Sequence, residues 1–336
     1  MALADSCGLA QLVKTTVTVP GSAGANAYLK VPALVAGMVA GADCIDDMDL
    51  LRHGGMDRLF GGIRAPSTLG TFLRACTFGH VRQLDVVAAT VLAGLAGRSP
   101  LLGGASAVAF VDVDDTVKQT YGYAKQGAGY GYSGVKGLNA LLATVSTPSN
   151  APVLVATRLR KGSANSARGA ARLVADAVRT AWRAGATGRV VVRADSAFDN
   201  HQVVAAARRA GAHFSVTARM TRAVTRAIAT IDETAWTPIR YPNAVWDDEE
   251  QHWVSDAEVA EVAFTAFTHR RQAEHVTARL IVRRVRRLNP ASAPGAGQGE
   301  LFTAYRYHAC LCATRRCLCP DMGVRDHHLR AVVAAC

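Results

Sequence analysis

The sequence of 336 residues lacks a long hydrophobic run. Its longest apolar stretches, such as residues 31–42, fall well short of the roughly 20 residues that a membrane-spanning helix requires. The opening residues, MALADSCGLAQLVK, have neither a basic start nor a continuous apolar core, so we expect no export signal. These absences argue against a membrane protein and predict a cytoplasmic location.

Acidic residues are fewer than basic ones. The sequence holds 26 Asp and Glu against 38 Lys and Arg, which gives a formal charge of +12 at pH 7. Lys and Arg spread over a surface attract nucleic acid without any contact to a base, so this excess favours a polyanionic partner. Ribosomal and membrane-surface proteins share the property, and charge alone does not choose among these classes.

A disulfide framework is also absent. Three of the eight cysteines are scattered and five lie within residues 310–336, a distribution that implies no pairing in a reducing compartment. An alternative for the late group is a zinc site. Its ligands would be Cys310, Cys312, Cys317 and Cys319 with His327 or His328. Their C-x-C spacing suits a tetrahedral zinc less well than C-x2-C.

Residues 109–116, AFVDVDDT, form an apolar run that turns abruptly acidic. Side chains alternate along a strand, so Asp112 and Asp114 would share one face while Asp115 points with the valines to the other. Carboxylates beside an apolar sheet are costly to desolvate unless a cation or a donor compensates them. The pattern predicts a divalent metal, with a polar strand end or a helix cap as the alternative.

A second stretch, GRVVVRADSAF at residues 188–198, has the same build, because Asp195 follows a β-branched run. If the two strands lie side by side, Asp114 and Asp195 converge. Hard oxygen ligands held in this way suit Mg²⁺ or Mn²⁺, and a metal held by carboxylates commonly serves phosphoryl transfer.

The segments around these stretches predict a mixed α/β sheet. Residues 140–146 and 153–157 fit a hairpin, residues 161–184 fit an amphipathic helix, and Asn200 fits the N-cap of the next helix. The order strand, hairpin, helix, strand, helix, strand, helix allows the two acid-bearing strands to be parallel neighbours. Residues 236–288 alternate polar and apolar side chains, as a β-rich region does.

Before residue 105 the sequence predicts short helices. Ser67 and Thr77 are candidate caps of two helices separated by a tight break, a pattern similar to a helix-turn-helix. In that interpretation Arg74 and Arg82 contact DNA phosphates. An ordinary helical bundle explains the same pattern.

Residues 117–139, here called the Gly/Tyr segment, alternate glycine and tyrosine with Lys118, Lys125 and Lys136. Tyrosine faces stack on bases and lysine heads meet phosphates, so the segment is a candidate nucleic-acid contact. A glycine-rich hairpin with tyrosines packed on the core fits equally well.

Residues 279–287 alternate apolar and basic side chains, with Arg283 and Arg286 among the basic ones. One face of such a strand would dock on protein while the other meets a DNA backbone. A solvated edge strand protected by arginines has the same pattern.

Four blocks occur in a characteristic order: AFVDVDDT, KQGAGYGYSGVKGLNALLATV, RADSAF and the β-rich residues 236–288. Together they resemble the DDE transposases of bacterial insertion sequences, nearest the family named insertion sequence thirteen-eighty. The resemblance implies a ribonuclease H-like mixed sheet flanked by helices, with a helical N-terminal region and a β-rich insertion. By the family's pattern the first acid falls on Asp114, with Asp112 in reserve, and the second falls on Asp195.

The resemblance also divides the chain into regions. These are a helical DNA-binding region at 1–104, the catalytic core at 105–235, the β-rich insertion at 236–300, the last core strand at 301–309 and an aberrant tail at 310–336. The family's third acid is a Glu that follows a strand similar to YRYHA, residues 305–309. No Glu lies beyond Glu300, so we expect a truncated or frameshifted C-terminus.

The function implied is transposition. Such a protein binds the terminal inverted repeats of its element and then cleaves and joins DNA with Mg²⁺ or Mn²⁺. We expect two such ions. We expect it to act as a homo-oligomer on double-stranded DNA and to be associated with the nucleoid. Its expected metal ligands are Asp112, Asp114 and Asp195. The missing third acid supports an alternative, a catalytically dead DNA-binding remnant that represses transposition. Another ribonuclease H-like nuclease is disfavoured by the β-rich insertion and the helical N-terminal region.

Overall fold

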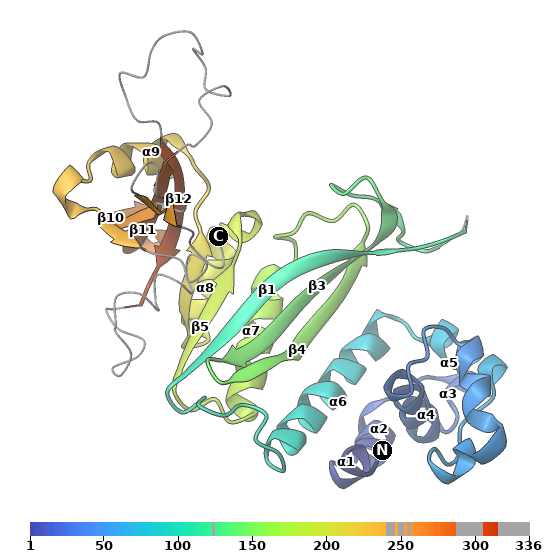
Figure 1. The fold of residues 1–336 in the computed structure, drawn as a ribbon. Coiled ribbons are helices and arrows are strands. Elements are labelled where there is room, and N and C mark those ends of the chain that lie inside the picture. The colour runs from blue at the N-terminus through green and yellow to red at the C-terminus, as the bar shows by residue number, and fades with distance from the viewer. Residues whose placement is uncertain (123–124, 240–245, 248–251, 254–256, 287–304, 315–336) are drawn as a thin grey trace. The chain divides into compact units, whose positions relative to one another are not determined.

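The computed structural model describes residues 1–122, 125–239, 246–247, 252–253, 257–286 and 305–314 (Figure 1). Contacts divide the chain into two units. The first comprises residues 1–103 with 182–185, and the second comprises residues 104–181 with 186–336.

The first unit is helical, as the sequence predicts. Its α-helices are α1 Ala2–Ser6, α2 Leu9–Thr16, α3 Gly21–Gly24, α4 Ala27–Val39, α5 Pro66–Ala75 and α6 Phe78–Ala96, and 3₁₀ helices span Asp46–Arg52 and Gly54–Arg58. Val13 of α2, Phe72 of α5 and Val87 of α6 share one buried cluster. Within the described residues, no helix is long and apolar enough to cross a membrane.

Helices α5 and α6 are separated by Cys76 and Thr77. The predicted cap Thr77 is confirmed, because its backbone N–H donates to His80 Nδ1 at 2.9 Å within a capping box. The predicted cap Ser67 is wrong. Ala65 occupies the N-cap of α5 and Pro66 the first helical position, where the N–H that proline lacks has no helical partner to lose.

The second unit is built on a ten-stranded sheet in the order β2-β3-β1-β5-β6-β12-β11-β10-β7, and β4 pairs with β3. The strands are β1 Val108–Gln119, β2 Gly129–Tyr130, β3 Lys136–Thr147, β4 Asn150–Lys161, β5 Arg189–Ala194, β6 His213–Thr217, β7 Thr237–Ile239, β10 Ala257–Ala266, β11 Val276–Arg286 and β12 Tyr305–Cys312. Strands β8 Trp246–Asp247 and β9 His252–Trp253 pair separately.

Strand direction around β1 defines the core of this unit. Strands β1, β3 and β4 are antiparallel neighbours, whereas β5 and β6 run parallel to β1. The order β4-β3-β1-β5-β6, with an antiparallel half and a parallel half, is that of a ribonuclease H-like sheet. The predicted mixed α/β fold is confirmed, and so is the parallel adjacency of the two acid-bearing strands.

Helices α7 Ala170–Arg183, α8 His201–Arg209 and α9 Arg222–Ala229 accompany the sheet. The amphipathic helix predicted at 161–184 is confirmed over 170–183, but residue 161 still belongs to β4. Five residues form the buried inner side of α7: Leu173, Val174, Ala177, Val178 and Ala181. Arg158 of β4 pairs with Asp176 of α7 at 3.6 Å, so α7 covers this part of the sheet (Figure 1). Asn200 caps α8 as predicted, accepting from Val203 N at 3.1 Å.

The sheet continues without a break from β6 through β12 to β11, β10 and β7. Strands in the predicted β-rich region are therefore confirmed among the described residues, while the finer boundaries at 235 and 300 stay predictions. Strand β12 runs on to Cys312, past the predicted end at Ala309. The segment interpreted as an aberrant tail thus begins inside the core.

The cysteines of β12 are packing residues. Cys310 and Cys312 are buried, and their sulfur atoms lie 3.2 Å from Ser215 Oγ and 2.9 Å from Thr314 Oγ1. A buried free cysteine behaves as a small apolar side chain, which suits a core strand. The remaining ligands of the zinc alternative lie outside the described residues: Cys317, Cys319, His327 and His328.

Candidate active site

Asp114 and Asp195 come from adjacent parallel strands. The β1–β5 register pairs Asp112 with Arg193 and Val113 with Ala194. Asp114 is the next residue of β1, and Asp195 directly follows the last residue of β5. Paired residues of neighbouring strands point to the same face. The sheet therefore brings the two predicted acids to one place, where the pairing with β5 ends.

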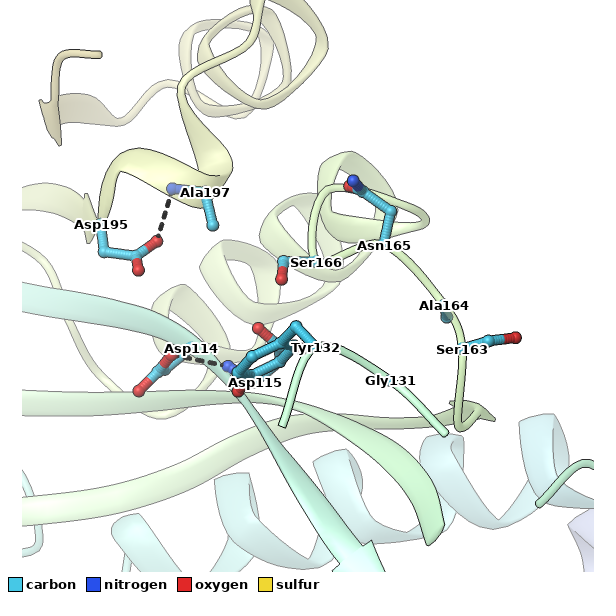
Figure 2. Close-up of a pocket in the computed structure, with 10 residues that line it drawn as sticks. All are labelled: Asp114, Asp115, Gly131, Tyr132, Ser163, Ala164, Asn165, Ser166, Asp195 and Ala197. Carbon is cyan, nitrogen blue, oxygen red and sulfur yellow. Dashed lines mark hydrogen bonds between the residues drawn. The ribbon is translucent and has the colours of Figure 1, made fainter. Parts of the chain in front are cut away.

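An open pocket of about 500 Å³ contains both acids (Figure 2). Its lining residues are Asp114, Asp115, Gly131, Tyr132, Ser163, Ala164, Asn165, Ser166, Asp195 and Ala197. The acids come from β1 and from the end of β5, and the other walls come from the Gly/Tyr segment and from the loop between β4 and α7. The sequence predicted the acids and the Gly/Tyr segment, and it gave no signal for the loop.

Backbone amides orient one oxygen of each carboxylate (Figure 2). Asp114 Oδ1 accepts from the N–H of Asp115 at 2.7 Å, and Asp195 Oδ1 accepts from the N–H of Ala197 at 2.9 Å. Asp195 is the N-cap of a 3₁₀ turn at Ser196–Phe198, which supplies that amide. Both acids are thus held by local backbone structure at the pocket wall.

Electrostatics at this wall favour a cation. Burial raises the pKa of Asp195 above the ordinary value of an aspartate, and the negative charges of Asp114 and Asp115 raise it further. The Ala197 amide opposes this shift by stabilising the ionised form. The repulsion that Asp195 experiences from these neighbouring charges is relieved when a cation binds between them.

The oxygen atoms at this wall suit the predicted metal. Carboxylate oxygens are the ligands that Mg²⁺ and Mn²⁺ prefer, so Asp114 and Asp195 fit such an ion. Over the described ranges, no three His, Cys, Asp or Glu side chains form a metal-binding group. Two carboxylates are compatible with Mg²⁺, because this ion commonly keeps several water ligands or takes oxygens from a substrate phosphate.

Asp112, the reserve for the first acid, has a different partner. Its carboxylate makes a two-point contact with Arg193 of β5, with Nε 2.5 Å from Oδ1 and Nη2 2.7 Å from Oδ2. It is not among the residues that line the pocket. Between the two candidates for the first acid, the geometry favours Asp114.

Asp115 has a role that the sequence did not reveal. Its side chain is 5% exposed and lies 3.3 Å from Nη2 of Arg160, whose own side chain is 6% exposed. Asn139 of β3 donates to the same Asp115 oxygen and accepts from Nε of Arg160 at 2.9 Å. Arginine at an inward position of an alternating strand is the signal that would have found this network.

The lysines predicted to contact DNA differ in exposure. Lys118, near the end of β1, and Lys125, in the Gly/Tyr segment, are exposed. Lys136 is half-buried, and its Nζ donates to the carbonyl of Gly122 at 3.4 Å. Tyr132 is 76% exposed at the pocket rim, so the alternative in which this tyrosine packs on the core does not hold.

The predicted arginines have varied surroundings. Arg74 is exposed on α5, whereas Arg82 is half-buried on α6 and pairs with Asp85 at 2.8 Å. Arg283 is half-buried in β11. The backbone of Arg286 ends β11, and its side chain lies outside the described part of the structure.

Comparison with known proteins gives two findings. Residues 31–290 match the family described as Transposase DDE domain group 1. Among solved structures, the chain is similar to one described as "Cryo-EM structure of piggyBac transposase synaptic complex with hairpin DNA (SNHP)", at 10% identity and a TM-score of 0.36. That likeness covers 99% of this chain and 56% of the other, so this chain spans little more than half of its length.

No curated protein matches the sequence. The family match, in contrast, extends over most of the chain and includes β1, β5 and both acids of the pocket. This protein belongs to the Transposase DDE domain group 1 family.

Proposed function

We propose that the protein is the transposase of a bacterial insertion sequence, of the thirteen-eighty group, and that it cleaves and joins DNA at the ends of its element. The observation that carries the proposal is the pocket that holds Asp114 and Asp195 on adjacent parallel strands. Family membership supports the reaction class, which is phosphoryl transfer.

Asp114 and Asp195 would bind the divalent cation, Mg²⁺ or Mn²⁺, as one of two ions. When bound, such ions neutralise charge on the reacting phosphate and favour ionisation of the attacking hydroxyl group. The amides of Asp115 and Ala197 fix the two carboxylates before any ion arrives. Polar side chains on the other walls, including Ser163 and Asn165, would position the DNA strand.

DNA is the proposed partner, in the form of terminal inverted repeats and target duplex, and the protein would act on it as a homo-oligomer. The excess of basic residues supports this proposal, since each phosphate neutralised by Lys or Arg releases counterions. Lys118 and Lys125 are exposed on the same unit as the pocket. The first unit, with α5 and α6, would recognise the terminal repeats.

A second candidate function follows from the third acid, because the Glu that the resemblance implies is not found after Ala309. Residues 310–336 include Asp321 and Asp326 and no Glu. A protein with two of three acids would bind the element's ends without cutting them and so repress transposition.

The test combines metal binding, DNA binding and cleavage. Full-length wild type, Asp114→Asn and Asp195→Asn are titrated with Mn²⁺ and incubated with duplexes that span the ends of the element. We expect both variants to lose Mn²⁺ binding and to retain binding of end DNA. Asp176→Asn, on α7 and outside the pocket, is the matched control.

Cleavage then separates the two functions. Mg²⁺-dependent nicking at the ends by wild type alone supports the transposase, whereas end binding without nicking in either metal supports the repressor. If Asp195→Asn binds Mn²⁺ as wild type does, the proposed site is wrong.

A further inference from the structure

Arg160 joins three strands beside the pocket. It lies near the end of β4, its Nε donates to Asn139 Oδ1 of β3 at 2.9 Å, and its Nη2 lies 3.3 Å from Asp115 Oδ2 of β1. Asn139 closes the triangle by donating to Asp115. Because Asp115 directly follows Asp114 in β1, this network fixes the backbone that carries the first acid.

The same guanidinium also holds the loop between β4 and α7. Its Nη1 lies 3.0 Å from the carbonyl oxygen of Asn165, 2.8 Å from that of Ser166 and 2.6 Å from that of Arg168. Residues 163–166 form the pocket wall contributed by this loop (Figure 2). One side chain therefore connects the acid-bearing strand to another wall of the same pocket.

All three nitrogens of Arg160 are engaged within the protein, and the side chain is 6% exposed. This guanidinium therefore has no nitrogen left to bind a phosphate in the pocket. A rigid planar fork is the side chain suited to bridge several fixed acceptors, and lysine cannot reproduce it. Arg160 thus acts through its neighbours.

We propose that Arg160 is a positioning residue for the metal site, holding Asp114 through Asp115 and setting the loop at 163–166 so that Asp114 and Asp195 bind one divalent cation. This inference rests on the function proposed for those two acids. Residues that orient metal ligands without touching the metal typically contribute about 10- to 100-fold to metal affinity.

The direction of a mutational effect distinguishes positioning from charge. Arg160 is a cation beside a proposed cation site, so its removal should tighten metal binding if only electrostatics mattered. It would also free the Asp115 carboxylate. If the fixed geometry matters more, metal binding weakens despite the more negative surroundings.

The experiment measures Mn²⁺ affinity of the full-length protein by electron paramagnetic resonance of free Mn²⁺, with folding checked by circular dichroism. We expect Arg160→Gln to bind Mn²⁺ about tenfold or more weakly. Arg160→Lys keeps the charge and loses the fork, so it should also bind more weakly. Arg158→Gln is the matched control, because Arg158 lies on the same strand and pairs with Asp176 of α7.

Each outcome supports or overturns the positioning role of Arg160. Unchanged or tighter Mn²⁺ binding by Arg160→Gln overturns the positioning role, and Arg160→Lys decides in the same way if the glutamine variant does not fold. Weakening by Arg158→Gln to the same degree also overturns it, since the effect would then be general. Asp195→Asn separates the two proposals: if it binds like wild type, the site itself is wrong, whatever Arg160 does.

Discussion

Asp112 and Arg193 form a two-point ion pair across the β1–β5 strand pair, with Nε 2.5 Å from Oδ1 and Nη2 2.7 Å from Oδ2. The Arg193 guanidinium also lies over the ring of Phe110, 4.3 Å from its centroid. Both oxygens of Asp112 are therefore compensated within the protein. In the described part of the chain, no cationic side chain is seen to pair with Asp114, two residues further on.

This difference predicts opposite phenotypes for two neighbouring acids. Asp112→Asn should lower the free energy of unfolding by about 1–3 kcal/mol, because it weakens a charge-assisted contact with Arg193, and should leave Mn²⁺ affinity nearly unchanged. Asp114→Asn should abolish Mn²⁺ binding with little loss of stability. Urea unfolding and Mn²⁺ titration of both variants check this, and the reverse pattern would make Asp112 the first acid.

The raised pKa of Asp195 predicts how stability depends on pH. Burial and the charges of Asp114 and Asp115 raise this pKa in the folded protein above its unfolded value. The folded state therefore binds the proton more tightly, and stability is lost as pH rises from the ordinary aspartate pKa, about 4, through the raised one. In EDTA at pH 7, Asp195→Asn should melt at a higher temperature than wild type.

Two internal controls accompany this measurement. The difference between the melting temperatures should shrink as the pH falls through the raised pKa, because wild type then becomes protonated as well. Excess Mn²⁺ should reverse the order at pH 7, since only wild type gains stability from the ion. A metal-free variant that melts below wild type at pH 7 would contradict the electrostatic description of the pocket.

The central sheet could be predicted because its signals are local. An apolar β-branched run followed by an acid marks the strands of Asp114 and Asp195, and the spacing of Leu173, Val174 and Ala177 marks the buried side of α7. Chain order then limits how those strands can neighbour each other. Each of these inferences needs only residues close together in the sequence.

The partners of the acids could not be predicted because they are distant in sequence. Arg193 is 81 residues from Asp112, and Arg160 is 45 residues from Asp115. Only the strand register decides which acid receives an arginine and which remains at the pocket. Composition alone also could not predict the place of Cys312. The high cysteine content of residues 310–336 suggested a metal site or a frameshift, whereas Cys312 is buried in a core strand.

We expect the stability of the β10–β11 region to depend on Arg284. Its guanidinium carbon lies 4.2 Å from the ring centroid of Trp236 and 4.4 Å from that of Tyr305. Its nitrogens pair with Glu258 at 2.5 Å and with Glu233 at 2.8 Å, and its side chain is 5% exposed. Arg284→Gln should destabilise the protein by about 2 kcal/mol, because the rings and the half-buried Glu258 lose their cation, whereas Glu233, which is 78% exposed, stays solvated.

Arg279 provides the matched comparison on the same strand. It pairs with Glu261, whose side chain is 43% exposed, so Arg279→Gln should cost only about 1 kcal/mol or less. Urea unfolding of both variants gives the comparison. Similar losses for the two substitutions would show that Arg284 is no more than an ordinary surface ion pair.

DNA affinity should depend on the exposed lysines in proportion to the phosphates they neutralise. Lys118 and Lys125 are exposed, so Lys118→Gln and Lys125→Gln should each weaken binding of all duplexes alike and reduce the slope of log affinity against log salt by about 1. Arg82→Gln should have a smaller effect, because Arg82 pairs with Asp85 at 2.8 Å and a phosphate must compete with that carboxylate. Fluorescence anisotropy with end duplex and random duplex, from low to physiological salt, measures the affinity and its slope.

Unchanged slopes for both lysine variants would show that the Gly/Tyr segment is not part of the DNA-binding surface. A larger effect of Arg82→Gln on end duplex than on random duplex would assign end recognition to α6.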